Sequence, residues 1–292
     1  MWWLKYDQRW EALQDKPFRL RGTLIHLCLQ YHYASKMAQP PSWFFERDLD
    51  TALDQDGAGY PSDVLKAKEL LFAYQREYLQ EPWTPYAVEE EFQATVGELD
   101  PGGPDSSLDD EIVTCRPDLL AVEHDPLTRE PFLWVYDYKT SGKNWEFADG
   151  RWIMRGGLER WKDDGPYALH WQVLINLLIL RAKTNAVRLS HLPVRGFVIQ
   201  RMTREPDRGL KYHFDRHTLK VPAGPYQQAP RAIRACVARE RAIRDGVEKG
   251  LAPAPSFWAC NTKFGPCDFR DVCLGPTPEE RQKILHERYA RE

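Results

Sequence analysis

The sequence predicts an α/β fold in which helices flank a mixed central β-sheet. Short segments rich in aromatic and β-branched residues, such as Phe132-Leu-Trp-Val-Tyr136, are typical of strands. They alternate along the chain with longer segments whose apolar residues follow helical periodicity. Turn signals rich in proline and glycine, such as Asp100-Pro-Gly-Gly-Pro104, separate the two kinds of segment. The expected elements therefore build one α/β core.

The first half of the chain supplies two helices and the centre of the sheet. An amphipathic run surrounds His26, and apolar residues both precede and follow Asp118. The elements expected here are a helix around His26, a helix over 62–80, and strands over 86–96, 111–122 and 132–139.

The second half adds a buried helix and the remaining strands. Residues 172–180 are apolar nearly all round, which predicts a helix buried against the sheet. An arginine-rich stretch with one apolar stripe predicts a later helix. The elements expected here are a helix over 167–183, strands over 186–200 and 211–214, and a helix over about 229–249.

Length and composition suit one intracellular domain. The 292 residues can bury one sizeable core, and the formal net charge is −3. Charged residues follow Met1-Trp2-Trp3 at once, and the apolar run over 171–180 is too short to span a membrane. We therefore expect a cytoplasmic protein. The expected single domain, 1–292, comprises an N-terminal helical part (1–85), a core (86–250) and a cysteine-rich tail (251–292) that packs back on the N-terminal part.

Two acidic residues and a lysine are the strongest functional signal. Asp137 and Lys139 share one face of their strand, and Asp118 heads a neighbouring apolar strand. An acid entering a buried strand is costly unless a partner or a metal compensates it. Two carboxylates offer the oxygen ligands that Mg²⁺ and Mn²⁺ prefer, and a lysine can hold water or neutralise developing charge. The alternative is ordinary charge on a solvated strand.

These residues resemble the PD-(D/E)xK nuclease superfamily and, within it, the RecB-like branch. Pro117-Asp118 and Asp137-Tyr138-Lys139 stand at the two signature positions, and Arg21-Gly22-Thr23-Leu24-Ile25-His26 is similar to the branch's histidine helix motif. Gln172 is similar to its glutamine motif, although Asn176 replaces the tyrosine often found there.

The resemblance implies a restriction-endonuclease-like core and a role for each matching residue. Asp118, Asp137 and the backbone carbonyl of Tyr138 would ligate the metal, and His26 would join them. Lys139 would activate water or stabilise charge, and Gln172 would orient Lys139 or a phosphate.

Two of these residues also have a purely structural interpretation. His26 lies among leucines, where a histidine is commonly a hydrogen-bonded core or boundary residue. Gly22, one turn earlier, favours the site interpretation because a missing side chain leaves room for metal or substrate. Gln172 lies in a buried helix, where it either bonds neighbouring backbone or faces the active site.

Three cysteines crowd the C-terminal region, at Cys260, Cys267 and Cys273. Their spacing is wider than structural zinc sites use, whereas iron–sulfur ligation tolerates it. The region resembles the AddB helicase-nuclease subunit and the CRISPR-adaptation exonucleases, which implies a [4Fe–4S] cluster with a fourth, N-terminal cysteine. No cysteine precedes Cys28, which is the candidate, but a small buried core residue is an equal interpretation. Disulfides are disfavoured in a chain of this size with no secretory segment.

Basic residues concentrate in the second half of the chain, over 181–250, and acidic residues gather ahead of the site, for example at Glu89-Glu90-Glu91. A basic half beside an acidic metal pocket suits a phosphate backbone, although a solvated helix face is an equal account of the helix over 229–249. Tryptophans interleave with cations just after the Asp137 strand, where they either stack unpaired bases or anchor packing. The candidate nucleic-acid contacts there are Lys143, Arg151, Arg155 and Arg160.

The function expected from these observations is a divalent-metal-dependent DNA nuclease. Exonuclease action on single strands or DNA ends is favoured, in recombination, repair or mobile-element DNA processing, with a helicase or recombinase as a partner. Two alternatives stay open: a site-specific endonuclease of the same fold, and a non-catalytic nucleic-acid-binding or assembly factor.

Overall fold

The computed structural model describes residues 10–12, 17–141, 145–148, 151–154, 171–189, 192–204, 212–219, 221, 223–248, 261–262, 265–266, 283 and 289–291. The chain divides into two compact units. One contains residues 20–235, and the other contains residues 1–19 and 236–292. The expected α/β class is confirmed in the first unit; the single-domain organisation stays a prediction.

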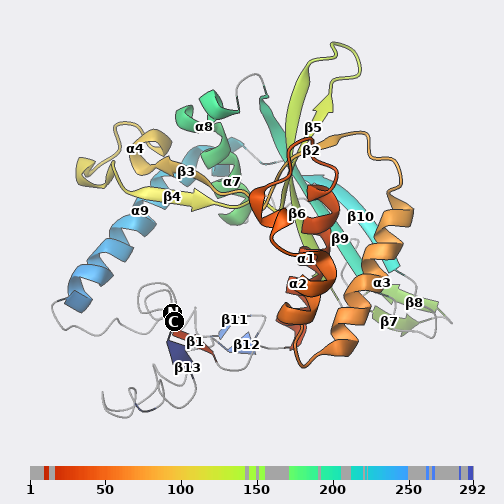
Figure 1. Ribbon diagram of the computed structural model, residues 1–292. Coiled ribbons are helices and arrows are strands. Elements are labelled where there is room, and N and C mark those ends of the chain that lie inside the picture. Colours follow the sequence, from red (N-terminus) through yellow and green to blue (C-terminus); the bar gives the residue numbers. More distant parts are fainter. Residues whose placement is uncertain are drawn as a thin grey trace. The chain divides into compact units, whose positions relative to one another are not determined.

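A five-stranded mixed sheet forms the centre of the first unit, in the order β10-β9-β6-β5-β2 (Figure 1). Only β6 and β9 run parallel, and the other neighbours are antiparallel. The strands are β2 (Thr84–Val88), β5 (Leu119–His124), β6 (Pro131–Ser141), β9 (Val194–Arg204) and β10 (Tyr212–Leu219). The mixed sheet expected from the sequence is therefore present.

Two expected strands are each broken in two. The strand expected over 86–96 is β2 followed by β3 (Phe92–Thr95), and the strand expected over 111–122 is β4 (Ile112–Cys115) followed by β5. Glu89 breaks the first with a left-handed φ of 51°, and Pro117, which has no N–H to donate, lies in the second break. β3 and β4 pair with each other in a separate two-stranded sheet. Because of these breaks, β3 and β4 do not belong to the central sheet.

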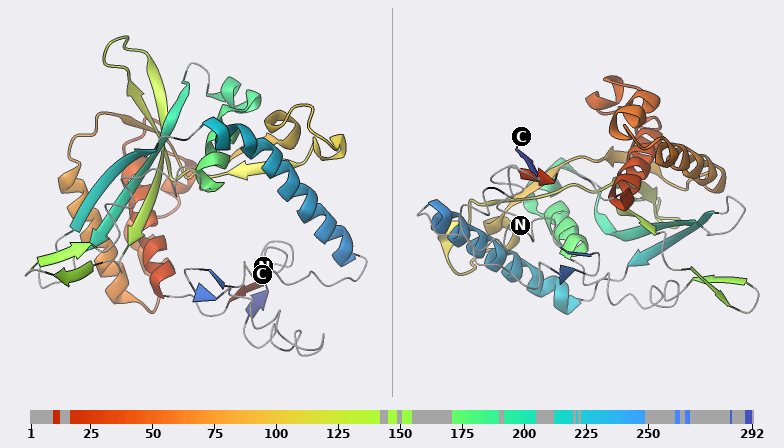
Figure 2. Two further views of the ribbon diagram at one scale, coloured as in Figure 1. Left: turned by 180° about the vertical axis from the view of Figure 1, so that it is seen from behind. Right: turned by 90° about the horizontal axis from the view of Figure 1, so that it is seen from below.

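Three helices cover one face of the sheet: α1 (Pro17–Ala34), α2 (Leu49–Asp56) and α3 (Pro61–Glu77). They appear in red to orange in Figures 1 and 2. Leu24, Leu29 and Tyr33 of α1 join a core cluster with Tyr136, Tyr138 of β6 and Val198 of β9. Because strand side chains alternate, Asp137 and Lys139 must face the other way, toward α7 (Trp171–Arg181).

The second half differs from expectation at its boundaries. Residues 183–188 form helix α8 (Lys183–Arg188), where the start of a strand was expected, and β9 begins only after Pro193. Helix α9 (Ala223–Glu248) begins earlier than expected and contains Pro230. The shorter elements of the first unit are η2 (Ser42–Phe45), α4 (Val96–Leu99), η3 (Ser106–Leu108), β7 (Trp145–Ala148) and β8 (Arg151–Met154).

The second unit is described only in short pieces. β1 (Trp10–Ala12) pairs antiparallel with β13 (Tyr289–Arg291), and β11 (Asn261–Thr262) pairs with β12 (Gly265–Pro266). Among the described residues of the whole chain, no helix combines the length and the apolar character that crossing a membrane requires.

A buried ion pair joins Glu81, in the segment after α3, to Arg216 of β10. The Arg216 guanidinium donates to both oxygens of Glu81 at 2.5 and 2.6 Å, and also to Gln200 Oε1 at 2.6 Å. It lies 3.7 Å from the centre of the Tyr78 ring and bonds the Tyr74 hydroxyl of α3 at 3.1 Å. The Glu81 side chain is only 6% exposed. Removal of the arginine would therefore leave a buried carboxylate without its cation.

Arg216→Met is expected to lower the free energy of unfolding by about 3–5 kcal/mol, the typical cost of uncovering one half of a buried pair. Arg195→Met is the matched control, because Arg195 pairs with Asp125 at the surface and such pairs contribute about 0–1 kcal/mol. Urea denaturation of both variants measures the difference. Equal effects would show that Arg216 contributes no more than a surface ion pair.

Candidate functional site

The site lies where the pairing of β5 with β6 ends. β5 begins at Leu119, which pairs with Tyr136, so the Tyr138 backbone has no hydrogen-bonding partner in β5. Side chains bond the Tyr138 backbone instead. The Tyr138 N–H donates to Asp118 Oδ2 at 2.6 Å, and His26 Nε2 lies 2.9 Å from the Tyr138 carbonyl oxygen. The sheet edge thus brings Asp118 and His26 to the Asp137-Tyr138-Lys139 segment.

A second cluster lies on the face of β6 that points away from α1, α2 and α3. Lys139 Nζ lies 3.0 Å from Asp137 Oδ1 and 2.7 Å from Oδ2. Gln172, near the start of α7, donates from Nε2 to Asp137 Oδ1 at 2.7 Å and accepts from Lys139 Nζ at 3.3 Å. Gln172 therefore contacts both Asp137 and Lys139.

Glu89 also lies at the site, although its sequence context did not identify it as a site residue. Val88 pairs with Leu119, so the residue that follows β2 lies across from the residue that precedes β5. The Glu89 N–H lies 3.3 Å from the Asp118 carbonyl oxygen. His26, Glu89 and Asp118 each offer one ligand atom, and these atoms all lie within 4.8 Å of one another. Glu89 lay inside the strand expected over 86–96, and no signal in the sequence placed it beside Asp118.

Crowding of the acids changes their protonation. Burial and the charge of Asp118 raise the pKa of Asp137 to about 6, against the opposing effect of Lys139. Burial and Asp118 likewise raise the pKa of Glu89 to about 7, although Arg116 acts in the opposite direction. Burial lowers the pKa of His26, but the hydrogen bond and charge of Asp118 outweigh it and raise the pKa overall. The three carboxylates thus gather more negative charge than their surroundings compensate.

The imidazole of His26 has two different neighbours. Nε2 lies at the Tyr138 carbonyl, and Nδ1 lies 3.5 Å from Asp118 Oδ1. When Nε2 carries a proton and donates it to the carbonyl, the neutral ring presents its lone pair at Nδ1, on the side of Asp118. Gly22, one turn earlier, lies beside Thr140, and a Cβ there would be 3.6 Å from Thr140 Oγ1, an ordinary contact. Local packing therefore does not itself require glycine.

Several sequence candidates lie elsewhere or outside the described residues. Of the expected nucleic-acid contacts, Arg151 lies in β8, and the other three, Lys143, Arg155 and Arg160, lie outside the part of the chain that the structure describes. Cys260, Cys267 and Cys273 lie outside it as well.

Cys28 lies fully buried in the core cluster of α1, α2 and α3. Burial raises the pKa of its thiol to about 12, which favours the neutral thiol over the thiolate that binds iron. This setting fits the packing interpretation of Cys28. The iron–sulfur cluster stays a prediction from the cysteine pattern.

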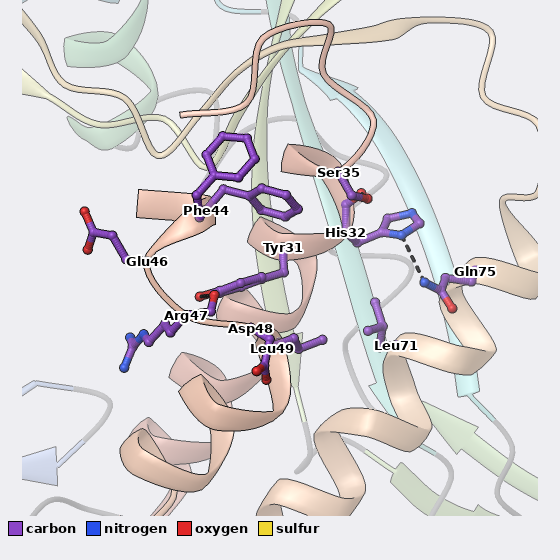
Figure 3. A pocket seen from close by; sticks show the side chains of 11 residues that line it. Tyr31, His32, Ser35, Phe44, Glu46, Arg47, Asp48, Leu49, Leu71 and Gln75 are labelled. Carbon is purple, nitrogen blue, oxygen red and sulfur yellow. Dashed lines mark hydrogen bonds between the residues drawn. The ribbon is translucent and has the colours of Figure 1, made fainter. Parts of the chain in front are cut away.

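A separate pocket of about 690 Å³ lies on the other side of α1 (Figure 3). Tyr31 and His32 of α1 line it, roughly 140° and 240° around the helix from His26, together with Ser35 just after the helix. Gln75 of α3 bonds His32 Nδ1 at 3.0 Å, and burial lowers the pKa of His32 to about 4. Phe44 and Phe45 supply an apolar wall. This pocket therefore presents a neutral imidazole and aromatic rings, in contrast to the acidic site.

Comparison with known proteins gives one family match. A family model described as the PD-(D/E)XK nuclease superfamily matches residues 1–274. Among solved structures, one from Eubacterium rectale, provisionally described as an exonuclease, is similar at a TM-score of 0.43 and 12% sequence identity. The similarity covers 94% of this chain and 79% of that one. Comparison with curated proteins gives no match.

Proposed function

The chain belongs to the PD-(D/E)XK nuclease superfamily, and we propose that it is a divalent-metal-dependent DNA nuclease. Its active site would lie at Asp118, Asp137 and Lys139. One observation carries the proposal. Asp118, Asp137 and Lys139, which match the family's signature positions, lie with His26 and Gln172 around one segment of β6, Asp137-Tyr138-Lys139.

The donor atoms suit Mg²⁺ or Mn²⁺. Carboxylate oxygens are the ligands these hard cations favour, and Mn²⁺ also accepts imidazole nitrogen. The three ligand atoms of His26, Glu89 and Asp118 lie within 4.8 Å of one another, so the three side chains could contact one cation. The excess negative charge of the three carboxylates also favours a cation.

The residues divide the work between binding and positioning. Asp118 and Asp137 would hold the ion, with the Tyr138 carbonyl, which retains a second lone pair, and His26 beside them. The ion, when bound, would polarise the scissile phosphate and lower the pKa of a water. Gln172 fixes the position of Lys139, whose ammonium would orient the attacking water or neutralise charge that develops on the phosphate oxygens.

The substrate is proposed to be single-stranded DNA or DNA ends. The support is the alternation of tryptophans and cations just after β6 in the sequence, because aromatic rings stack unpaired bases and cations bind phosphates. Such an enzyme would act in recombination, repair or mobile-element processing. An endonuclease built on the same site would need no free end, which makes the two activities separable by experiment.

Cleavage of end-labelled linear DNA and covalently closed circular DNA, each single- and double-stranded, tests the proposal. With Mg²⁺ or Mn²⁺ we expect linear substrates to be degraded and circles to survive, and EDTA should stop the reaction. Cutting of circles would establish an endonuclease. Absence of cleavage on every substrate would contradict the nuclease proposal and favour a binding factor.

A further inference from the structure

We propose that two copies of this chain associate through the outer faces of their α3 helices, packed against each other in antiparallel orientation. The outer face of α3 consists of Leu65, Glu69, Phe72 and Arg76 on the helix and Leu79 just after it. It contains none of the site residues described above, so the inference does not rest on the proposed nuclease function.

Large apolar side chains lie exposed at regular intervals along α3, the orange helix in Figure 1. Leu65 is 59% exposed and Phe72 is 64% exposed, while Leu79, two residues after the helix ends, is 80% exposed. Seven residues make nearly two full turns, so Leu65 and Phe72 share one side of the helix. Three of the eight large apolar side chains that are exposed among the described residues thus follow one another here. Single exposed apolar residues are ordinary, whereas a row of them marks an interaction surface.

The inner face of α3 is already covered by the rest of the first unit. The side chains that it buries in the core cluster are Val64, Ala67, Leu70, Leu71 and Tyr74. The helix therefore has apolar residues on two sides, and only one of these sides is packed. A helix that is apolar on more than one side is normally buried more completely than α3 is within one chain.

The charges of the outer face indicate what covers it. Glu69 and Arg76 lie about 4.5 Å before and about 6 Å after Phe72 along the helix axis. A two-fold axis at Phe72 would bring Glu69 of each copy opposite Arg76 of the other. It would also bring Phe72 against Phe72, and Leu65 toward Leu79. Parallel pairing would instead set like charges against each other. The face is thus complementary to itself in antiparallel orientation, as a symmetric dimer interface must be.

Both charged side chains are available for this contact. Arg76 is exposed and makes no ion pair or hydrogen bond within the part of the chain that the structure describes. Glu69 Oε2 accepts from the Tyr212 hydroxyl at 3.5 Å, which leaves Oε1 able to accept from a guanidinium. Formation of the dimer would therefore break no ion pair within either copy.

The expected association is weak, because one pair of helices forms a small interface. Stable specific interfaces bury about 1,200–2,000 Å², and even some of those have only micromolar affinity. We therefore expect dimers to form at about 10–100 μM protein. Such a range is accessible to sedimentation velocity of the full-length protein over a concentration series.

Phe72→Glu should abolish the dimer over that series, because it removes the central ring contact and sets two like charges at the two-fold axis. Loss of a central aromatic contact should weaken association at least about tenfold. Leu127→Glu is the matched control, since it makes the same change of charge at a leucine that is 92% exposed in the turn between β5 and β6. This control should dimerise as the unsubstituted protein does. A monomer at every concentration of the unsubstituted protein, or an unchanged dimer in Phe72→Glu, would overturn the inference.

A charge exchange tests the antiparallel orientation. Glu69→Arg alone and Arg76→Glu alone each set like charges opposite one another, so both single variants should dimerise less. The double variant restores opposite charges across the axis and should recover the dimer. Lack of recovery would contradict the proposed pairing.

Circular dichroism establishes whether each variant folds before it is sedimented. If Phe72→Glu does not fold, Phe72→Gln removes the ring without adding a charge, and it should also dimerise less. Dimerisation of Phe72→Gln as tight as that of the unsubstituted protein would overturn the inference.

Discussion

Asp137→Asn is expected to reduce DNA cleavage by more than about 100-fold while making the metal-free protein more stable. The activity should fall because the amide replaces a charged metal ligand, and loss of groups that merely orient such ligands already costs about 10–100-fold. The substituted amide would retain a carbonyl oxygen able to accept from Lys139 and Gln172, the present partners of Asp137. The local structure should therefore survive.

The gain in stability follows from the raised pKa. Asp137 is 3% exposed, and its pKa is raised from 3.8 to about 6. The native carboxyl keeps its proton up to about pH 6, whereas the unfolded chain releases it near pH 4, so the metal-free native state loses stability as the pH rises between these values. Asparagine cannot ionise. Its advantage should be small at about pH 4 and reach roughly 3 kcal/mol above about pH 7.

Thermal unfolding in EDTA at about pH 4.5 and pH 8, together with cleavage assays, measures both effects. In a chain of this size we expect a rise of several degrees at the higher pH, because about 1 kcal/mol corresponds to roughly 2–4 °C. Asp110→Asn, at an exposed position, should change neither property. Full activity of Asp137→Asn, or an advantage that is larger at low pH, would show that Asp137 does not have this role.

Lys139→Met is expected to separate catalysis from metal binding. Methionine retains much of the aliphatic stem but removes the ammonium, which contacts Asp137 at 2.7 Å and Gln172 at 3.3 Å. Cleavage should fall by about 10²–10⁴-fold, the usual contribution of a group that transfers a proton or stabilises developing charge. Mn²⁺ binding should be retained, because the variant loses no oxygen or nitrogen ligand.

Titration with Mn²⁺, followed by electron paramagnetic resonance of the free ion, and a single-turnover cleavage assay test this separation. Lys183→Met, at an exposed position, is the matched control and should behave as the unsubstituted protein does. Lys139→Arg should restore little activity, since a planar guanidinium does not replace a compact ammonium. Loss of Mn²⁺ binding in Lys139→Met would mean that Lys139 shapes the metal site instead of acting on the substrate.

Periodicity in the sequence was enough to predict the sheet and its main helices. The aromatic run before Asp137 predicted β6, and the apolar run around Gln172 predicted α7. Alternation along β6 then placed Asp137 and Lys139 on one face, and the contacts with Gln172 agree with that placement. Local sequence patterns determine these features, so they can be inferred from a single sequence.

The breaks in the strands could not be located from the same patterns. The sequence over 86–96 has the pattern of one strand, but β2 ends at Val88, before the left-handed backbone of Glu89. The strand expected over 111–122 included Pro117, whereas Pro117 lies in a break between β4 and β5. Both breaks depend on pairing between segments distant in the chain, which strand propensity does not encode.

Glu89 was missed for the same reason. Its neighbours Glu90 and Glu91 made it one member of an acidic run, and only the pairing of Val88 with Leu119 brings it to Asp118. The role of His26 was likewise undecided from its leucine-rich surroundings. The contact of its Nε2 with the Tyr138 carbonyl exists because β5 leaves the sheet edge at that point.

The most direct test of the proposed metal-dependent nuclease site is the position of a bound ion. Crystals of the protein equilibrated with Mn²⁺ should give an anomalous difference peak between the carboxylates of Asp118 and Asp137, about 2.0–2.3 Å from the nearest oxygen of each. A peak at that position would support the proposed centre. No peak there at saturating Mn²⁺, or a peak only at another place in the molecule, would contradict it.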